Sequence, residues 1–333
     1  MLATADVDQY LSNTETTVSF ADMLLKAIYL QIAVLFLTAL WLIFSKRRSL
    51  LDTFFKTSAI MVLILGLWLG GVWFYPPVYG LFLFGLVIIG LIIWHLRKDV
   101  SKTSRWRNVL SNIPLIVLLP LGGYLFSQGF TGRLQPDADF IELTPPFKIN
   151  EGTCVLSGGL SPLLNFHNFP SQEPRDIAQT YGLDFIKTRS NGFRTTLGNT
   201  LNPKPKTPEQ YEMFNTAVFS PCDGLVVEYE NGLPDQPIGG SDKVNTGGNG
   251  IVLACGKYHV HLHHLKQGSV IPQLGEVIEA GQKVGEIGNS GNTIEPHLHL
   301  HAETIVESGN TNRHGKPVHM RFNGRFMARG DCF

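Results

Sequence analysis

The sequence has no net charge, because 27 lysines and arginines balance 27 aspartates and glutamates. It also has only four cysteines in 333 residues, and none lies in a Cys-x-x-Cys pair. The charge balance excludes the strongly basic composition of a typical nucleic-acid-binding protein, so we expect no nucleic acid partner. The missing Cys-x-x-Cys spacing argues against a zinc ribbon or a thiol oxidoreductase.

The balanced total conceals two halves of different kinds. Residues 1–130 contain 10 basic and 6 acidic residues, whereas residues 131–333 contain 17 and 21. Ten of the eleven histidines and all four cysteines follow residue 130. The length allows two domains, so we expect a boundary near residue 130, with the chemistry in residues 131–333.

Charged residues are missing from long stretches of the first half. Residues 27–44 are an uncharged, mostly apolar run that would be about 27 Å long as a helix, enough to cross the hydrocarbon core of a bilayer. Residues 57–96 are uncharged throughout, and Tyr75-Pro76-Pro77 interrupts them where a helical hairpin would turn. A buried bundle in a soluble protein is the alternative, which runs of this length disfavour.

A fourth apolar run contains Pro114 and Pro120, which would kink a soluble helix but are tolerated in a membrane bundle. The first half is therefore predicted to be a transmembrane anchor in the lipid bilayer. Its four helices are expected near residues 27–44, 57–74, 78–96 and 109–126.

The basic residues of this half cluster in two loops, which predicts the orientation. The first loop holds Lys46, Arg47, Arg48 and Lys56, and the other holds Arg97, Lys98, Lys102, Arg105 and Arg107. Loops rich in lysine and arginine stay in the cytoplasm. The acidic N-terminal tail and the uncharged Pro-Pro loop are then outside, so everything after about Arg133 is expected on the extracytoplasmic side. The first span is not a cleavable signal by pattern, because its positive charges mostly follow the apolar run.

The four cysteines lie in the exported part, where disulfides form and persist. The sequence leaves all three pairings of Cys154, Cys222, Cys255 and Cys332 open. We expect these residues to be structural.

From Phe219 onward, short apolar segments alternate with glycine and asparagine turn signals, which predicts a mainly antiparallel β domain. Residues 201–216 and 234–248 are rich in Pro, Gly, Asn and Asp, so they are expected to be loops that could wall a cleft. Residues 220–226 and 275–285 also resemble the hairpins of biotinyl and lipoyl carrier domains. However, Lys283 lacks the Met or Asp flanks of a modified lysine, and a carrier would leave the histidines unexplained.

A His-x-His pair near the C-terminus carries the strongest chemical signal. In an extended strand, His297 and His299 point the same way, with Cα atoms about 6.6 Å apart. The alternative is a strand with histidines on its solvent face. A hydrolytic zinc site usually has three protein ligands and one open position, so the pair needs further ligands. Candidates are His167, Asp184 and a cluster of four histidines at positions 259, 261, 263 and 264.

Six segments in this order resemble the lysostaphin-type zinc endopeptidases, which cut peptide bridges and stems of peptidoglycan. They are Asn165-x-His167 with Gly182-x-Asp184, Pro221-Cys-Asp-Gly224, Gly248-Asn-Gly250, His264-Leu-Lys-Gln-Gly-Ser-Val270, Gly285-Glu-Ile-Gly-Asn-Ser-Gly-Asn292 and Pro296-His-Leu-His299. The resemblance covers roughly residues 150–326 and says nothing about the membrane half.

The resemblance implies a site in which His167, Asp184 and His299 bind one Zn²⁺ and His264 and His297 are catalytic. Zinc would activate a water that hydrolyses a peptide bond. The implied substrate is the peptide part of peptidoglycan, which agrees with an extracytoplasmic location.

The sequence departs from the commonest form of that family at the first ligand. There the ligand stands four residues before the aspartate, and here that residue is Thr180. His167 fits an alternative form with a distant Asn-x-His segment. If His167 were only a surface residue, the domain would be a non-catalytic peptidoglycan-binding or regulatory module, with a membrane or periplasmic regulator as a partner.

The remaining histidines allow several interpretations. His259, His261 and His263 share one face of a strand and His264 lies on the other, so a regular strand could turn only one set toward zinc. The aligned three form a rival metal site, but the resemblance favours His264. His301 is either a support for the ligands or an exposed strand residue. His314 and His319 are expected to be structural or exposed.

Overall fold

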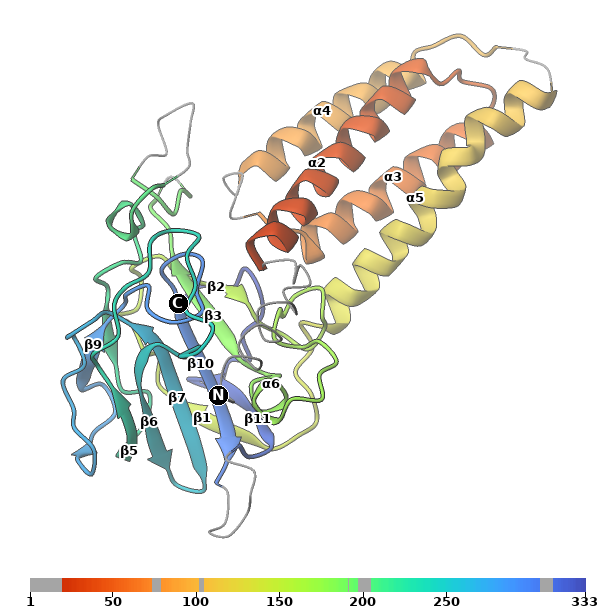
Figure 1. Cartoon of the computed structure of the whole chain (residues 1–333). Coiled ribbons are helices and arrows are strands. Elements are labelled where there is room, and N and C mark those ends of the chain that lie inside the picture. Colours follow the sequence, from red (N-terminus) through yellow and green to blue (C-terminus); the bar gives the residue numbers. More distant parts are fainter. Residues whose placement is uncertain (1–19, 74–78, 102–104, 191, 197–204, 306–313) are drawn as a thin grey trace, which may run out of the picture.

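The computed structural model describes residues 20–73, 79–101, 105–190, 192–196, 205–305 and 314–333. It has an N-terminal bundle of long helices and a C-terminal, mainly antiparallel β domain, as the sequence predicted (Figure 1). The acidic tail and the Tyr75-Pro76-Pro77 turn lie outside the described residues.

Four helices make up the bundle: α2 (Phe20–Phe44), α3 (Leu50–Gly70), α4 (Tyr79–Leu96) and α5 (Arg105–Thr131). Among the described residues, three segments are long and apolar enough to cross a membrane, namely Lys26–Phe44, Leu50–Gly70 and Ser111–Thr131. The described apolar part of α4, Phe82–Leu96, is shorter than these three. The apolar runs of the sequence are therefore helices, and their composition fits a membrane anchor.

Glycines allow α3 and α5 to pack closely. A Cβ on Gly66 would lie 2.7 Å from the carbonyl oxygen of Gly122, and a Cβ on Gly129 would lie 2.7 Å from Cβ of Leu69. Small residues at such crossings are typical of membrane helix pairs, because packing between backbones replaces the hydrophobic effect. α5 continues through Pro114 and Pro120.

The described parts of the two basic loops, residues 45–49 and 97–101, meet at the end of the bundle that is opposite the β domain (Figure 1). The backbone amide of Ser101 donates to the carbonyl of Arg47 over 2.9 Å, and the Arg47 guanidinium donates to the carbonyl of Leu96 over 2.6 Å. The positive charge is thus gathered at one end of the bundle.

The β domain, residues 140–333, is built on one large sheet in the order β1-β11-β10-β7-β6-β5-β8, with β2 and β3 attached through β10 and with a separate β4-β9 pair. All pairs are antiparallel except β1 with β11. The strands are β1 (Phe140–Leu143), β2 (Thr153–Ser157), β3 (Leu183–Lys187), β4 (Ala217–Phe219), β5 (Gly224–Glu230), β6 (Asn249–Cys255), β7 (Tyr258–Leu265), β8 (Val277–Ile278), β9 (Lys283–Glu286), β10 (Leu298–Thr304) and β11 (Pro317–Phe322). The short helices are α6 (Pro174–Ala178) and the 3-10 turn η1 (Pro208–Gln210).

Apolar side chains on the inner face of this sheet form one core. Phe185, Leu262 and Leu300 are completely buried in it. Because strand residues alternate between faces, the opposite face of β7 and β10 receives the odd-numbered histidines.

Two arginines join the β domain to the ends of α3 and α5 that lie next to it. Arg133 donates to the carbonyls of Leu69 over 3.1 Å and of Arg329 over 2.6 Å. The buried Arg329 donates to the carbonyl of Leu156 over 3.0 Å and lies 4.3 Å from the ring centre of Phe166. Nearby, Ile28 and Val72 of the bundle pack against Phe166 and Ile294. The β domain is therefore docked directly on the bundle.

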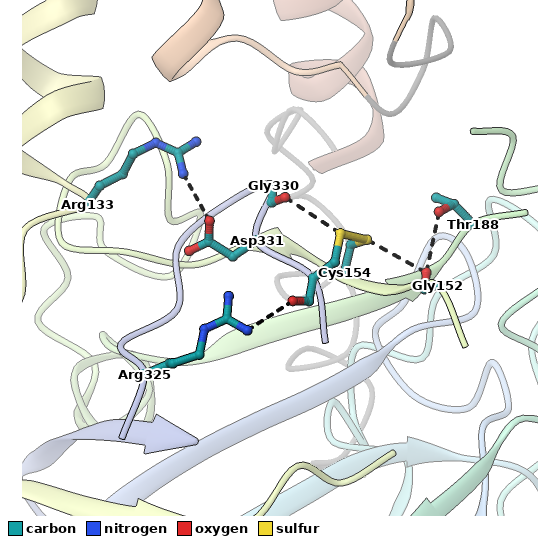
Figure 2. Close-up of a disulfide and its surroundings, with 8 residues drawn as sticks. Arg133, Gly152, Cys154, Thr188, Arg325, Gly330 and Asp331 are labelled. Atoms are coloured by element: carbon teal, nitrogen blue, oxygen red, sulfur yellow. Dashed lines mark hydrogen bonds and ion pairs between the residues drawn. A yellow bond between two sulfur atoms is a disulfide. The ribbon is translucent and has the colours of Figure 1, made fainter. Parts of the chain in front are cut away.

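Two disulfides resolve the three pairings that the sequence left open: Cys154 pairs with Cys332, and Cys222 pairs with Cys255. The first fixes the C-terminal segment to β2 beside the bundle. Figure 2 shows Arg133 reaching the Asp331 carboxylate next to this disulfide, at a distance of 3.5 Å.

Loss of the Cys154–Cys332 disulfide is expected to destabilise the β domain. The bond joins residues 178 positions apart, and removal of a native disulfide typically costs about 2–5 kcal/mol. Thermal unfolding of Cys154→Ser/Cys332→Ser should therefore occur at a lower temperature than that of the parent. The Cys222–Cys255 bond stays intact in this variant, so any change comes from the other bond. An unchanged unfolding temperature would show that the C-terminal segment needs no covalent link to β2.

Candidate metal centre and catalytic histidines

His299 lies at the centre of the candidate site, on the middle strand of three. β10 pairs with β3 on one side and β7 on the other, which places Asp184 and His263 directly opposite His299. Directly opposite residues on antiparallel strands have Cβ atoms about 5 Å apart. The register alone therefore brings one carboxylate and one imidazole to His299.

His167 and Asp184 complete a group of three potential metal ligands with His299. Nε2 of His167 lies 3.0 and 2.9 Å from the two Asp184 carboxylate oxygens, and Nδ1 of His299 lies 2.9 Å from Oδ1. One ligand atom from each residue lies within 4.8 Å of the others. Asp184 and His299 are buried, whereas His167 is partly accessible.

Asn165 explains how a distant segment reaches Asp184. Its side-chain oxygen accepts from the backbone amide of His167 over 2.9 Å, which fixes the local turn. Its amide nitrogen donates to the carbonyl of Thr180 over 3.2 Å, so the Asn-x-His segment is held against the residues that precede Asp184. Gly182 leaves the necessary space, since a Cβ there would lie 2.9 Å from Cε1 of His299.

His297 and His264 lie beside this group. Nδ1 of His297 donates to the carbonyl of Glu295 over 2.8 Å, and Nδ1 of His264 donates to the carbonyl of Ser290 over 2.8 Å. The two ring centres are 4.6 Å apart. With the proton on Nδ1, each neutral ring keeps an unprotonated Nε2, and that of His297 lies 3.7 Å from Asp184 Oδ1.

A β-bulge allows His263 and His264 to lie on the same side of the sheet. His264 has a positive φ of 65°, and the β6–β7 register shifts between Asn249 and Ile251. An extra residue at a bulge interrupts the alternation of side chains. The ring centres of His263 and His264 are consequently 6.0 and 6.1 Å from that of His299. The either-or choice between these faces, which assumes a regular strand, does not apply to β7.

Burial and neighbouring charges set the protonation states of this group. Burial alone would raise the pKa of Asp184, but the imidazoles of His167, His299 and His297 hold it well below its usual range. Burial, followed by the proximity of His167, lowers the pKa of His299 to about 4. Burial also lowers the pKa of His264 well below its usual value, with His297 adding to the effect. At neutral pH the site therefore combines the Asp184 carboxylate with uncharged His299 and His264 rings, and a carboxylate and a neutral imidazole are the forms that bind metal ions.

The metal-free protein is expected to lose stability as the pH falls below 6.5. The unfolded chain then protonates its histidines first, while buried His299 stays neutral to about pH 4. Each buried histidine that stays neutral lowers the free energy of unfolding by at most about 1.4 kcal/mol per pH unit in this interval. The unfolding temperature of chelator-treated protein should therefore be lower at pH 5 than at pH 7. Equal unfolding temperatures would contradict the assigned neutral states.

The other histidines fall into two sets. His301 is buried, with Nδ1 2.9 Å from Nε2 of His299, so the exposed alternative for His301 is wrong. The rival cluster is also different from expectation, because the second compact group consists of His261, His263 and His301 and does not include His259. His319 stacks on Tyr181 with ring centres 3.6 Å apart, a structural role. His314 is partly exposed, and its Nδ1 lies 3.7 Å from Glu303.

Two acidic residues near the site, Glu303 and Glu295, are not among the residues predicted from the sequence. Glu303 follows His299 and His301 at the same alternate spacing, so the strand pattern contained the signal for it. Glu295 forms a buried ion pair with Arg194 at 3.1 Å, which ties residues 192–196 to the loop before His297. No local sequence pattern connects those two residues.

One protein-family model matches part of the β domain. Residues 210–323 match the model of peptidase family M23. His264, His297 and His299 lie within the matched residues, whereas His167 and Asp184 precede them. Comparison with curated proteins gave no significant match.

Among solved structures, the chain is similar to the catalytic domain of lysostaphin from Staphylococcus simulans, with 21% identity over 40% of this chain and 74% of that chain and a TM-score of 0.25. It is also similar to a zinc-containing peptidase from Vibrio cholerae, with 17% identity, 48% of this chain covered and a TM-score of 0.28. The chain spans 36% of that peptidase.

The donor set of the first group suits zinc. Two imidazoles and one carboxylate are common ligands of hydrolytic zinc sites, and together they leave a divalent cation with net positive charge. Nε2 of His299 faces Nδ1 of His301, so His301 can hold the ring of His299 with its Nδ1 toward Asp184. The residues present therefore fit a zinc ion.

Proposed function

We propose that this protein is a membrane-anchored zinc endopeptidase that hydrolyses peptide bonds in the stems or cross-bridges of peptidoglycan. The observation that carries the proposal is the compact group of His167, Asp184 and His299, with His264 and His297 beside it. The match of residues 210–323 to the model of peptidase family M23 supports a peptidase at the general level.

Within this proposal, His167, Asp184 and His299 hold the zinc ion. When bound, zinc supplies a Lewis acid for a peptide carbonyl and lowers the pKa of water to about 7. The Asp184 carboxylate contacts both His167 and His299, so it fixes the two rings relative to each other before metal arrives. Such preorganisation favours metal binding.

His264 and His297 carry out the proton transfers in this proposal. Each ring carries its proton on Nδ1, which is engaged by a backbone carbonyl, so each Nε2 can accept a proton but cannot donate one. Neither ring can stabilise an oxyanion by hydrogen bonding until it has been protonated. We therefore assign them first as general bases, with the protonated ring then donating to the developing oxyanion or the leaving amine.

The location of the site fits a substrate outside the membrane. Phe166, the neighbour of His167, and Ile294, near His297, both pack against Ile28 and Val72 at the outer end of the helices. The basic loops are at the opposite end of the bundle, which by the positive-inside rule would face the cytoplasm. The proposed active site would then face the cell wall close to the membrane surface.

Cleavage by the full-length protein in detergent tests the proposal. Purified protein with added Zn²⁺ should release soluble peptides from isolated peptidoglycan, and a chelator should stop the release until zinc is restored. A regulatory or binding module would instead sediment with peptidoglycan without releasing fragments. That result would leave the fold intact and refute the enzyme.

A further inference from the structure

A second cluster of histidines extends from the proposed zinc site along the same face of the sheet. β7 and β10 pair so that His263 lies opposite His299 and His261 lies opposite His301. The ring centres of His261 and His301 are 4.2 Å apart and the rings are nearly parallel. The register of two strands therefore builds this cluster without any loop.

We propose that His261, His263 and His301 form a second site for a divalent transition-metal ion. One nitrogen from each of these residues lies within 4.8 Å of the others, as in the first group. Three imidazoles suit zinc, copper or nickel, and do not suit magnesium or calcium, which prefer oxygen ligands.

A buried nitrogen without a partner is the first independent support for a ligand here. Nδ1 of His263 is buried and has no hydrogen-bond partner among the described residues. Buried polar atoms nearly always have a partner, since leaving one unpaired costs about 1–3 kcal/mol. If Nδ1 is the nitrogen that His263 offers to the cluster, a metal ion that accepted its lone pair would remove this cost.

A carboxylate behind the cluster is the second support. Oε1 of the buried Glu303 lies 3.2 Å from Nε2 of His261, and Oε2 accepts from the backbone amide of Gly315 over 2.9 Å. When Glu303 holds the proton of His261 on Nε2, Nδ1 of that ring is left as the metal-binding atom. Carboxylates orient metal-binding histidines in this way in many sites, and Glu303 also brings negative charge near the cation.

The hydrogen bond between His299 and His301 couples the two sites. If His299 binds zinc through Nδ1, its Nε2 carries the proton and donates to Nδ1 of His301 over 2.9 Å. The proton of neutral His301 is then on Nε2. A second cation on His301 must displace either that proton or the hydrogen bond, so it should bind more weakly than the first.

Metal counting on the full-length protein tests this second site without using activity as the readout. Chelator-treated protein in detergent is equilibrated with increasing Zn²⁺, and bound zinc per chain is measured by elemental analysis. The parent should bind one zinc tightly and a second more weakly. His263→Gln should lose the weaker zinc, whereas His259→Gln, a matched change on the same strand face outside the cluster, should keep both.

His263→Gln could lose zinc because it misfolds, so a second variant tests the site with His263 in place. His167→Ala should lose the tight zinc and keep the weaker one, which resides on other residues. One zinc at saturation in the parent, two in His263→Gln, or none in His167→Ala would each overturn the second site. Failure of the peptidase proposal would look different, since zinc could bind at both sites without any release of peptides.

Discussion

Replacement of His299 by alanine is expected to remove the tightly bound zinc and to reduce peptidoglycan cleavage by more than about 100-fold. Loss of a residue that merely supports a ligand costs about 10–100-fold in metal affinity or activity, so loss of the central ligand should cost more. His299 is buried and contacts both Asp184 and His301, so its loss removes the ligand that joins the two.

His259→Ala is the matched control. His259 lies on the same face of the sheet as His299, on the neighbouring strand β7, but belongs to neither compact group. Zinc content and peptide release are measured for both variants. If His299→Ala keeps the tight zinc and full activity, the proposed ligand set is incorrect. If both variants lose zinc, the cause is general disruption of the sheet.

Replacement of His264 or His297 by glutamine should separate catalysis from metal binding. Both variants are expected to keep the tight zinc but to lose about 10²–10⁴-fold in turnover, the usual contribution of a positioned acid or base. Glutamine is neutral and of similar length, and it cannot accept a proton at neutral pH. Elemental analysis and the rate of peptide release report the two properties independently.

The comparison between the two positions also tests their roles. If either variant loses its zinc together with its activity, that histidine is a ligand and the proposed division of roles is wrong. If either variant retains full activity, the histidine replaced in it is not a catalytic base. The double variant should be only slightly worse than the poorer single variant if the two rings act in one proton transfer.

The sequence predicted the fold class because its signals are local. Uncharged runs identify membrane-compatible helices, and alternating apolar residues identify the sheet. The start of α3 could not be predicted from the sequence in the same way. The helix begins at Leu50 because Ser49 accepts from the backbone amide of Asp52 and caps it, and buried Lys56 pairs with Asp52 inside the helix. Because Asp52 and Lys56 lie inside α3, the charged residues of the sequence do not mark where this helix begins. The division of the chain near residue 130 stays a prediction.

The candidate site was predictable where its residues follow a motif and not where geometry depends on distant contacts. His297 and His299 share a strand face by spacing alone. The approach of His167 to Asp184 depends on Asn165 reaching Thr180, and the side that His264 faces depends on a bulge with positive φ. Neither feature can be derived from the alternation of a regular strand.

We propose that His167, Asp184 and His299 hold a zinc ion that serves peptide-bond hydrolysis in peptidoglycan. Mass spectrometry of the peptidoglycan fragments produced by full-length protein tests it most directly, with His299→Ala measured in parallel. We predict fragments with newly formed peptide termini, present with the parent protein plus Zn²⁺ and absent with the variant. Intact peptides after incubation with zinc-loaded protein, or fragments in which only glycan bonds are cut, would contradict the claim.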